Sequence, residues 1–522
     1  MSVFKSFSLM SILTFLSRIL GYARDLLFAF IFGASSSADS FLLAFRLPNL
    51  FRRLFAEGAI SNALIPLYLD IKKKSNKKIA QTFYNSVFNY LIIILLIVTV
   101  LAEIFMKEII SFLAPGFTED LINKTSFLAS IMFPYLILIS ISSVIGALFN
   151  ANGRFAMWAF SPIILNLGMI IALGVSYFYF AIPELILSWA VIISGILQLL
   201  VMIFWSFKIN IKIKFSKPRV SKNIKKFFSL LMPNILAGGI LQINQFIGVI
   251  FASSIMGAIS WLYYADRVVQ LPLGIFIVSI STILLTTLSN QKAKKSKKNI
   301  DQQIEFSCLL MLCLTLLCML GLIALSDLIV DILFKRGKFG LGDVLATSDA
   351  IVMYSIGLPA FGFIKIFSVI FFSEKNTLIP FLISTFSMLV NLFLIVLLVG
   401  SMGHLGIALS LSLASYFNVI ALYIFLHKKK YWKLSKNFIK KIFKILITSF
   451  LTYILLITAY MLILFSDYFS LSGFMSKTFT LSLLMFLAVI TFTVLLIMFR
   501  VINYNAIKNR KFSDLFTERK FG

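Results

Sequence analysis

The sequence predicts an all-α integral membrane protein with fourteen transmembrane helices. Hydrophobic residues make up 60% of the 522 residues and charged residues only 13%, and the mean hydropathy is +0.99. A soluble core could not bury so many apolar side chains at this length, so lipid must cover them. Apolar runs of about 20 residues, long enough for a helix across the hydrocarbon layer, recur along the whole chain.

Fourteen such runs can be identified, and the first of them is not a cleaved signal peptide. Arg18, Arg24 and Asp25 interrupt it, and no small-residue cleavage site follows it. We therefore expect the mature protein to keep this segment. The runs lie near residues 8–33, 37–56, 84–106, 125–149, 157–180, 184–207, 226–254, 257–288, 304–326, 346–372, 377–399, 403–426, 443–466 and 476–499.

The links between these runs alternate in charge. Links after even-numbered runs are rich in lysine, whereas links after odd-numbered runs are short or mixed in charge. Since basic loops are retained in the cytoplasm, we expect both termini and every even link on that side. The basic segments lie near residues 72–78, 208–226, 292–298, 428–441 and 500–520.

The net charge of +28, from 48 basic and 20 acidic residues, is explained mainly by this alternation. In a soluble protein such an excess would indicate nucleic-acid binding. Here most of the cations lie in the links, where they orient the protein and contact anionic lipids. No nucleic-acid partner is expected.

A weak internal repeat predicts two pseudo-symmetric six-helix lobes, followed by two further helices. Six-helix halves of the same orientation are typical of parallel-repeat transporters. A shift of 221 residues aligns Phe30 with Phe251, Ala44 with Ala265, Arg46 with Arg267 and Leu50 with Leu271. The predicted division is an N-lobe at 1–207, a basic cytoplasmic link at 208–226, a C-lobe at 227–427, helices 13 and 14 at 428–500, and a basic cytoplasmic tail at 501–522.

Charged residues are concentrated within or beside the predicted spans of the first seventy residues. Each charge at mid-bilayer costs about 2.5–3.5 kcal/mol, so such residues normally face a bundle interior or an aqueous cavity. The set comprises Arg18, Arg24, Asp25, Asp39, Arg46, Arg52, Arg53 and Glu57, and the eighth run adds Asp266 and Arg267.

Two interpretations of these charges stay open. In the first they are structural: Arg24 pairs with Asp25 or Asp39, Arg267 pairs with its neighbour Asp266, and the arginines at 52 and 53 reach the inner interface. In the second, several arginines converge on a cavity that binds an anion. Guanidinium groups stay charged and match phosphate oxygens bidentately, which favours the second interpretation.

Other features exclude several kinds of chemistry. Cys308, Cys313 and Cys318 recur at steps of five on one helix, so they share no face and lack metal-ligand spacing. No Walker loop, GxSxG or HExxH motif occurs. No span carries a paired acid motif of the kind that would hold magnesium for a prenyl-diphosphate transferase. Neither a metal nor a cofactor is expected.

The stretch from Leu16 to Pro66, LSRILGYARDLLFAFIFGASSSADSFLLAFRLPNLFRRLFAEGAISNALIP, resembles the signature of the MurJ (MviN) family. These proteins are lipid II flippases of the multidrug/oligosaccharidyl-lipid/polysaccharide exporter superfamily. The resemblance covers most of helices 1–12 in order. Further matches are APGF at 114–117, NANGRF at 150–155, SPIILN at 161–166, SWLYYADRVVQLPLG at 260–274 and LFKRGKF at 333–339.

The resemblance implies two six-helix lobes around a V-shaped cavity, with helices 13 and 14 forming a groove for a lipid tail. It also implies that Arg24, Arg52 and Arg267 hold the diphosphate of a lipid-linked precursor. The other residues expected to line the cavity or take part in gating are Arg18, Asp25, Asp39, Arg46, Asn49, Glu57, Ser260 and Asp266.

One departure concerns the coupling ion. Some members of the family resemble a sodium-coupled design with acidic ligands in helices 7 and 11. Here those helices offer Asn244, Gln245 and Asn391 and no acid. A sodium site is therefore not expected, and the membrane potential acting on a cationic cavity is the alternative, since one charge across 100 mV is worth about 2.3 kcal/mol.

The expected function is transport without covalent chemistry, and so not that of an enzyme. The protein would move undecaprenyl-diphosphate-linked disaccharide-pentapeptide, lipid II, from the inner to the outer leaflet of the bacterial inner membrane by alternating access. The alternatives are a flippase for another polyprenyl-diphosphate-linked glycan and a drug/cation antiporter of the same superfamily. The expected partners are lipid II, membrane lipids and the cell-wall synthesis machinery.

Overall fold

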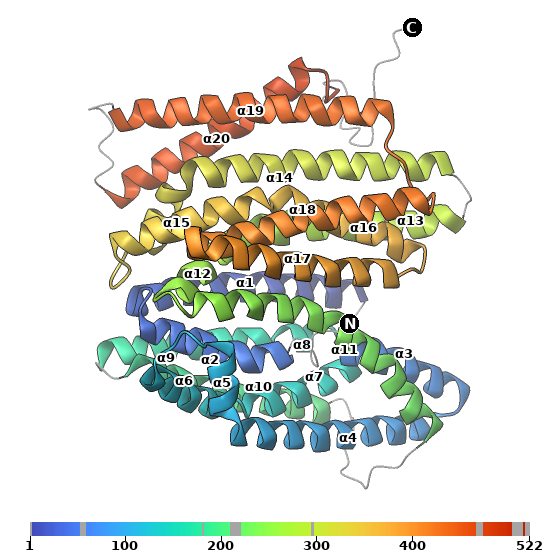
Figure 1. Ribbon diagram of the computed structural model, residues 1–522. Helices are drawn as coiled ribbons and strands as arrows, with labels where there is room; N and C mark the ends of the chain where they lie inside the picture. The colour runs from blue at the N-terminus through green and yellow to red at the C-terminus, as the bar shows by residue number, and fades with distance from the viewer. Residues whose placement is uncertain are drawn as a thin grey trace. The chain divides into compact units, whose positions relative to one another are not determined.

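The computed structural model describes residues 3–52, 59–179, 182–208, 221–293, 297–465, 473–503 and 515–516. Within these ranges every regular element is a helix and no strand occurs (Figure 1). The predicted all-α class is therefore confirmed.

The helices follow one another with short connections. The first ten are α1 (Val3–Phe32), α2 (Ser36–Phe51), α3 (Ala59–Lys74), α4 (Lys77–Ile104), α5 (Met106–Leu113), α6 (Glu119–Met132), α7 (Tyr135–Ala151), α8 (Ala156–Ala159), α9 (Ser161–Phe178) and α10 (Pro183–Lys208). The others are α11 (Lys222–Ala252), α12 (Ala258–Pro272), the π-helical turn η2 (Leu273–Ile277), α13 (Val278–Ala293), α14 (Lys297–Phe334), α15 (Leu341–Ile356), α16 (Leu358–Ser373), α17 (Leu378–Met402), α18 (His404–Lys428), α19 (Lys436–Phe465) and α20 (Phe474–Met498).

Among the described residues, twelve helices or helix pairs are long and apolar enough to cross a membrane. Four of them are interrupted: α6 continues into α7, α8 into α9, α12 through η2 into α13, and α15 into α16. Proline explains one interruption directly, because Pro272 cannot donate a helical hydrogen bond and the π-helical turn begins at the next residue.

The two remaining predicted spans, near 8–33 and 37–56, fall on α1 and α2, which are not among the twelve. The apolar stretch of α1 carries three charged residues, Arg18, Arg24 and Asp25. The α2 helix has only 16 residues and contains Pro48. The exact count of fourteen spans stays a prediction.

The chain divides into two compact units. Unit 1 comprises residues 1–260 together with 336–340, and unit 2 comprises residues 261–335 together with 341–522. Packing defines these units, whereas the internal repeat defines the predicted lobes at 1–207 and 227–427. The lobe boundaries stay a prediction.

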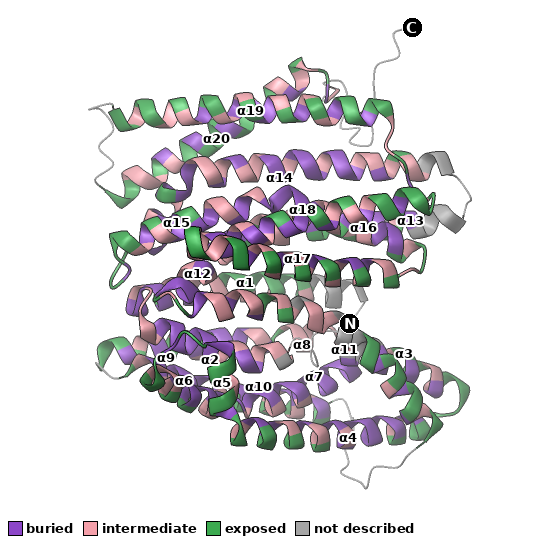
Figure 2. Cartoon of the chain, viewed as in Figure 1, coloured by how far each residue is buried: buried purple, intermediate pink, exposed green. Residues whose placement is uncertain are grey.

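In unit 1, α3, α4, α7 and α11 enclose one apolar core. Tyr84 of α4, Phe149 of α7 and Phe227 of α11 are almost completely buried in it. The other side of α4 exposes large apolar residues such as Ile97 and Val100. Buried and exposed residues consequently alternate along this helix (Figure 2), as expected for a helix between a protein core and lipid.

In unit 2, α14 packs against α15, α16, α19 and α20. The two last helices contact α14 through a small cluster containing Leu325, Leu456 and Leu484. Near the ends of the helices, the ammonium group of Lys477 in α20 pairs with the Asp331 carboxylate of α14. Helices α19 and α20, which lie outside the repeat, are therefore part of the packed unit.

Candidate substrate-binding and gating site

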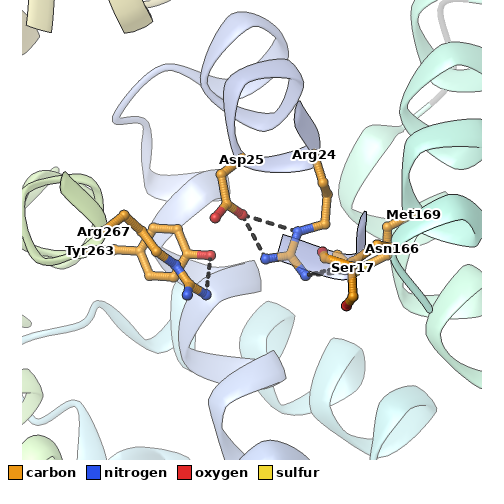
Figure 3. A network of polar contacts seen from close by, with 7 residues as sticks. All are labelled: Ser17, Arg24, Asp25, Asn166, Met169, Tyr263 and Arg267. Atoms are coloured by element: carbon orange, nitrogen blue, oxygen red, sulfur yellow. Dashed lines mark hydrogen bonds and ion pairs between the residues drawn. The ribbon is translucent and has the colours of Figure 1, made fainter. Parts of the chain in front are cut away.

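The Arg24 guanidinium is buried where α1 packs against α9 (Figure 3). Its Nε and Nη2 atoms both donate to Oδ1 of Asp25, at 3.0 and 2.6 Å. Its Nη1 donates to Oδ1 of Asn166 at 3.1 Å, and the Asn166 amide donates to the Ser17 carbonyl at 3.0 Å. Arg24 is 8% exposed and Asp25 only 4%. This is one of the two pairings that the structural interpretation gave for Arg24, and it compensates both buried charges.

The Asp39 carboxylate joins the start of α2 to the start of α12. Its Oδ2 accepts from the Gly257 amide at 2.8 Å. Its Oδ1 accepts from the Ser260 amide at 2.9 Å and from the Ser260 hydroxyl at 2.6 Å. Asp39 is 2% exposed. The structure thus brings together two predicted site residues, and the carboxylate satisfies amides that a helix start would leave unpaired.

Three more predicted residues recur at intervals of three in the second half of α2 and at its C-cap. Nη1 of Arg46 donates to the Gln245 carbonyl of α11 at 3.4 Å. Nε of Arg52 donates to Oδ1 of Asn49 at 3.1 Å, and the Asn49 amide donates to the Phe45 carbonyl at 3.0 Å. Arg46, Asn49 and Arg52 are half-buried. Two cations therefore lie near the end of α2 in unit 1, Arg46 within the helix and Arg52 at its C-cap.

In unit 2, Arg267 and Asp266 are adjacent on α12 but bind different partners. The Arg267 guanidinium lies over the Tyr263 ring, 4.9 Å from its centroid, and donates to the Tyr263 hydroxyl at 3.0 Å (Figure 3). Asp266 accepts from the Gln270 amide at 2.5 Å. The ring holds the cation through the face of its π system and so orients the half-buried guanidinium.

For Arg18 and Glu57, the other two predicted site residues, the structure gives less information. Arg18 is exposed on α1. Glu57 lies outside the described residues. Because Arg24 and Arg52 belong to unit 1 and Arg267 to unit 2, the convergence of these three arginines on one anion stays a prediction.

Several residues that support the site were not predicted. Asn166 and Tyr263 hold two of the arginines, and both lie within sequence motifs that resemble the family, which was the available signal. A second group supports the start of α2: Lys124 pairs with the buried Glu184 at 2.5 Å and donates to the Ser37 hydroxyl at 2.8 Å. A single sequence does not indicate that Lys124 and Glu184, which are 60 positions apart, would form an ion pair.

A cleft of about 220 Å³ lies among α1, α7, α8 and α9. Thr14, Ser17 and Asn150 supply its polar lining, and Phe155 and Trp158 part of its apolar lining. Because small-molecule sites usually measure about 300–1,000 Å³, this cleft alone is too small for a large lipid-linked substrate.

Buried charged groups that are satisfied by distant helices of a multi-pass protein, as Arg24 is by Asn166 and Asp39 by Ser260, are typical of membrane transporters, where they mark the substrate path. The fold and the site thus define a helical, multi-pass membrane transporter. The model of the family described as "Lipid II flippase MurJ" matches residues 28–484, and the chain belongs to this family. The predicted family is confirmed, and the protein is a transporter rather than an enzyme.

Curated relatives match most of the chain. The "Probable lipid II flippase MurJ" of Buchnera aphidicola subsp. Acyrthosiphon pisum is 37% identical over 468 residues, which are 88% of this chain and 91% of the relative. The protein of the same name from Rickettsia prowazekii is 37% identical over 433 residues, 82% of this chain and 85% of the relative.

Solved structures show the same fold. A lipid II flippase MurJ in an inward closed conformation matches with a TM-score of 0.79 at 29% identity, covering 96% of this chain and 99% of that chain. An inward-facing multidrug resistance MATE family transporter of the MOP superfamily matches with a TM-score of 0.67 at 13% identity, covering 79% and 94%. The second likeness concerns the fold alone.

Proposed function

We propose that this protein is a lipid II flippase, which moves the undecaprenyl-diphosphate-linked peptidoglycan precursor from the inner to the outer leaflet of the bacterial inner membrane. The observation that carries this proposal is the family match across residues 28–484. Relatives named as lipid II flippases and covering more than four fifths of the chain support it. Transport would proceed by alternating access.

The membrane arrangement that we propose has fourteen spans and places both termini in the cytoplasm. It adds α1 and α2 to the twelve long apolar spans. Helices α3 and α18 both end in lysines, Lys72–Lys74 and Lys428, as expected for helix ends at the cytoplasmic surface. Residues 1–207 and 227–427 would form the two lobes, and 428–500 the groove for the polyprenyl tail.

Arg24, Arg52 and Arg267 are the proposed diphosphate ligands. The burial of Arg24 beside Asp25 supports this role, because a phosphate group could take the place of the carboxylate and present oxygens to the same nitrogen atoms. Binding would then release Asp25 from its ion pair. Such an exchange couples the arrival of the substrate to a change in the contacts of α1.

The other cavity and gating residues would make and break contacts as the lobes move. Asp39 with Ser260 supports this part of the proposal, since two helix starts are held by a single carboxylate. We also propose that the protein contacts the cell-wall synthesis machinery. Its membership of the flippase family is the only support for this part of the proposal.

The test is a depletion strain that carries the wild-type gene or a variant with Arg24→Ala, Arg52→Ala or Arg267→Ala. Lipid II on the outer face of the membrane should fall on depletion and should not be restored by the variants. Arg500→Ala, at an exposed position after α20, is the matched control and should restore it. Normal growth with all three variants would contradict the diphosphate clamp. A fall in a different lipid-linked glycan, with lipid II unchanged, would contradict the substrate.

A further inference from the structure

The turn between α5 and α6 docks on the junction between α11 and α12, within unit 1. The Gly116 amide donates to the buried Ser253 hydroxyl at 3.1 Å. A Cβ atom at position 116 would lie 2.4 Å from the Cα atom of Ser254 and 2.5 Å from its nitrogen. Backbone therefore meets backbone, and no side chain fits at this position without moving the turn.

The turn at 336–340 makes a similar contact with the junction between α1 and α2, again within unit 1. The Lys338 amide donates to the Phe30 carbonyl at 2.9 Å. Gly337 has a φ of +59°, and a Cβ atom there would lie 2.2 Å from the Phe30 carbonyl oxygen. Gly33, just after α1, has a φ of +60°, and a Cβ atom there would lie 2.5 Å from the Lys338 carbonyl oxygen. Both glycines thus supply a left-handed backbone and a close approach.

The two contacts are related by the internal repeat. The shift of 221 residues that aligns Phe30 with Phe251 also aligns Gly116 with Gly337 and Gly33 with Ser254. Each turn therefore comes from one repeat and docks on the other, at equivalent junctions. Reciprocal contacts of this kind, in which i meets j and j meets i, are the signature of a two-fold relation. The contact of Asp39 with Ser260 also joins residues 221 apart.

We propose that the turns containing Gly116 and Gly337 form a paired latch that closes the outer end of the transport path, with the two glycines as positioning residues. The inference rests on the proposed flippase function, because alternating access requires one end to close while the other opens. All four segments follow odd-numbered spans, which places them together on the predicted outer side. Because each contact joins a segment of one repeat to a segment of the other, a movement that separates the repeats would break both contacts together.

The test uses a reporter thiol in a variant without the native cysteines Cys308, Cys313 and Cys318. Ser253→Cys places the thiol under the first turn, where the serine is 5% exposed. A membrane-impermeant maleimide, applied to spheroplasts, measures how often that turn lifts. Gly116→Val should raise labelling directly. Gly337→Val, which alters only the other turn, should also raise the labelling rate, by roughly tenfold, the effect of about 1.4 kcal/mol on the closing equilibrium.

Gly340→Val is the matched control, since Gly340 lies in the same turn as Gly337 but has no atom within 4 Å of its Cβ position. Equal labelling in the Gly337→Val and Gly340→Val variants would overturn the paired latch. If a valine variant does not reach the membrane, Gly337→Ala and Gly340→Ala are compared in the same way. The readout is independent of the transported lipid: unchanged outer-leaflet lipid II on depletion would contradict the flippase function, while coupled labelling would still support the latch.

Discussion

At the scale of single residues, Asp39 has the most closely defined role. Its carboxylate lies in the first turn of α2 and accepts three hydrogen bonds from Gly257 and Ser260 at the start of α12. A carboxylate accepts at both oxygens, whereas an amide side chain must present a donor on one side. The arrangement therefore depends on the charge state as well as on the size of this residue.

We expect Asp39→Asn to destabilise the protein by about 3 kcal/mol, because an N–H group would face the Gly257 amide or the Ser260 donors and leave them unsatisfied. Ser260→Ala removes only the hydroxyl bond and should cost about 1 kcal/mol. Thermal unfolding of the purified protein in detergent measures both. Equal effects of the two substitutions would show that the charge on residue 39 has no special part in joining the helix starts.

A second prediction at this scale concerns Asn166, which links Arg24 to the Ser17 carbonyl. Asn166→Leu preserves the approximate size but removes both hydrogen bonds, so unfolding should become easier by about 1–3 kcal/mol. Restoration of outer-leaflet lipid II should fall as well, since Arg24 loses the partner that orients it. Asn123→Leu, at an exposed site on α6, is the control. If the Asn166→Leu protein were as stable and as active as this control, the proposed role of Asn166 in orienting Arg24 would be contradicted.

At the scale of elements, the terminal pair α19–α20 is held to α14 by apolar packing and by one carboxylate. Asp331 of α14 pairs with Lys477 of α20, and also, at 3.1 Å, with Lys335, the residue that follows the end of α14. The two lysines provide a matched comparison. Lys477→Ala should lower the unfolding temperature more than Lys335→Ala, by the equivalent of about 1 kcal/mol, because only the first breaks a contact between helices and the groups remain partly accessible to water. A larger effect of Lys335→Ala would contradict this role.

The elements also show why some features could be predicted and others could not. Apolar runs are local, so the sequence predicted each of the twelve long spans near its observed position. The pairing of Arg24 with Asp25 could also be suggested from the sequence, because the two residues are neighbours. The contact of Asp39 with Ser260 joins residues 221 apart, and Lys124 meets Glu184 across 60 residues. Such pairings depend on how the helices pack, which hydropathy does not specify. The break between α6 and α7 at Phe133–Pro134 likewise lies inside one continuous apolar run.

At the scale of the whole molecule, the excess of positive charge has two separate consequences. Most cations lie in the links and at helix ends, as in Lys72–Lys74 and Lys428, where they are expected to orient the chain. A few arginines lie inside the helices instead, and Arg24 is buried with Asp25. The inner set acts on the substrate in our proposal, and it is also the set that the transmembrane voltage can act on.

The last prediction follows from this second set and concerns what drives transport. Helices α11 and α17 contain no aspartate or glutamate, so a sodium site built on acids of these helices is not available. In our proposal the empty cavity is positively charged and would be drawn toward the negative interior by about 2.3 kcal/mol per charge and 100 mV, whereas a cavity that holds a diphosphate would be neutralised and would move outward without that cost. Collapse of the potential with a potassium ionophore should therefore lower outer-leaflet lipid II, and replacement of sodium by potassium without the ionophore should leave it unchanged. Loss of transport on sodium replacement alone, with the potential maintained, would contradict this account and would require a cation site elsewhere in the protein.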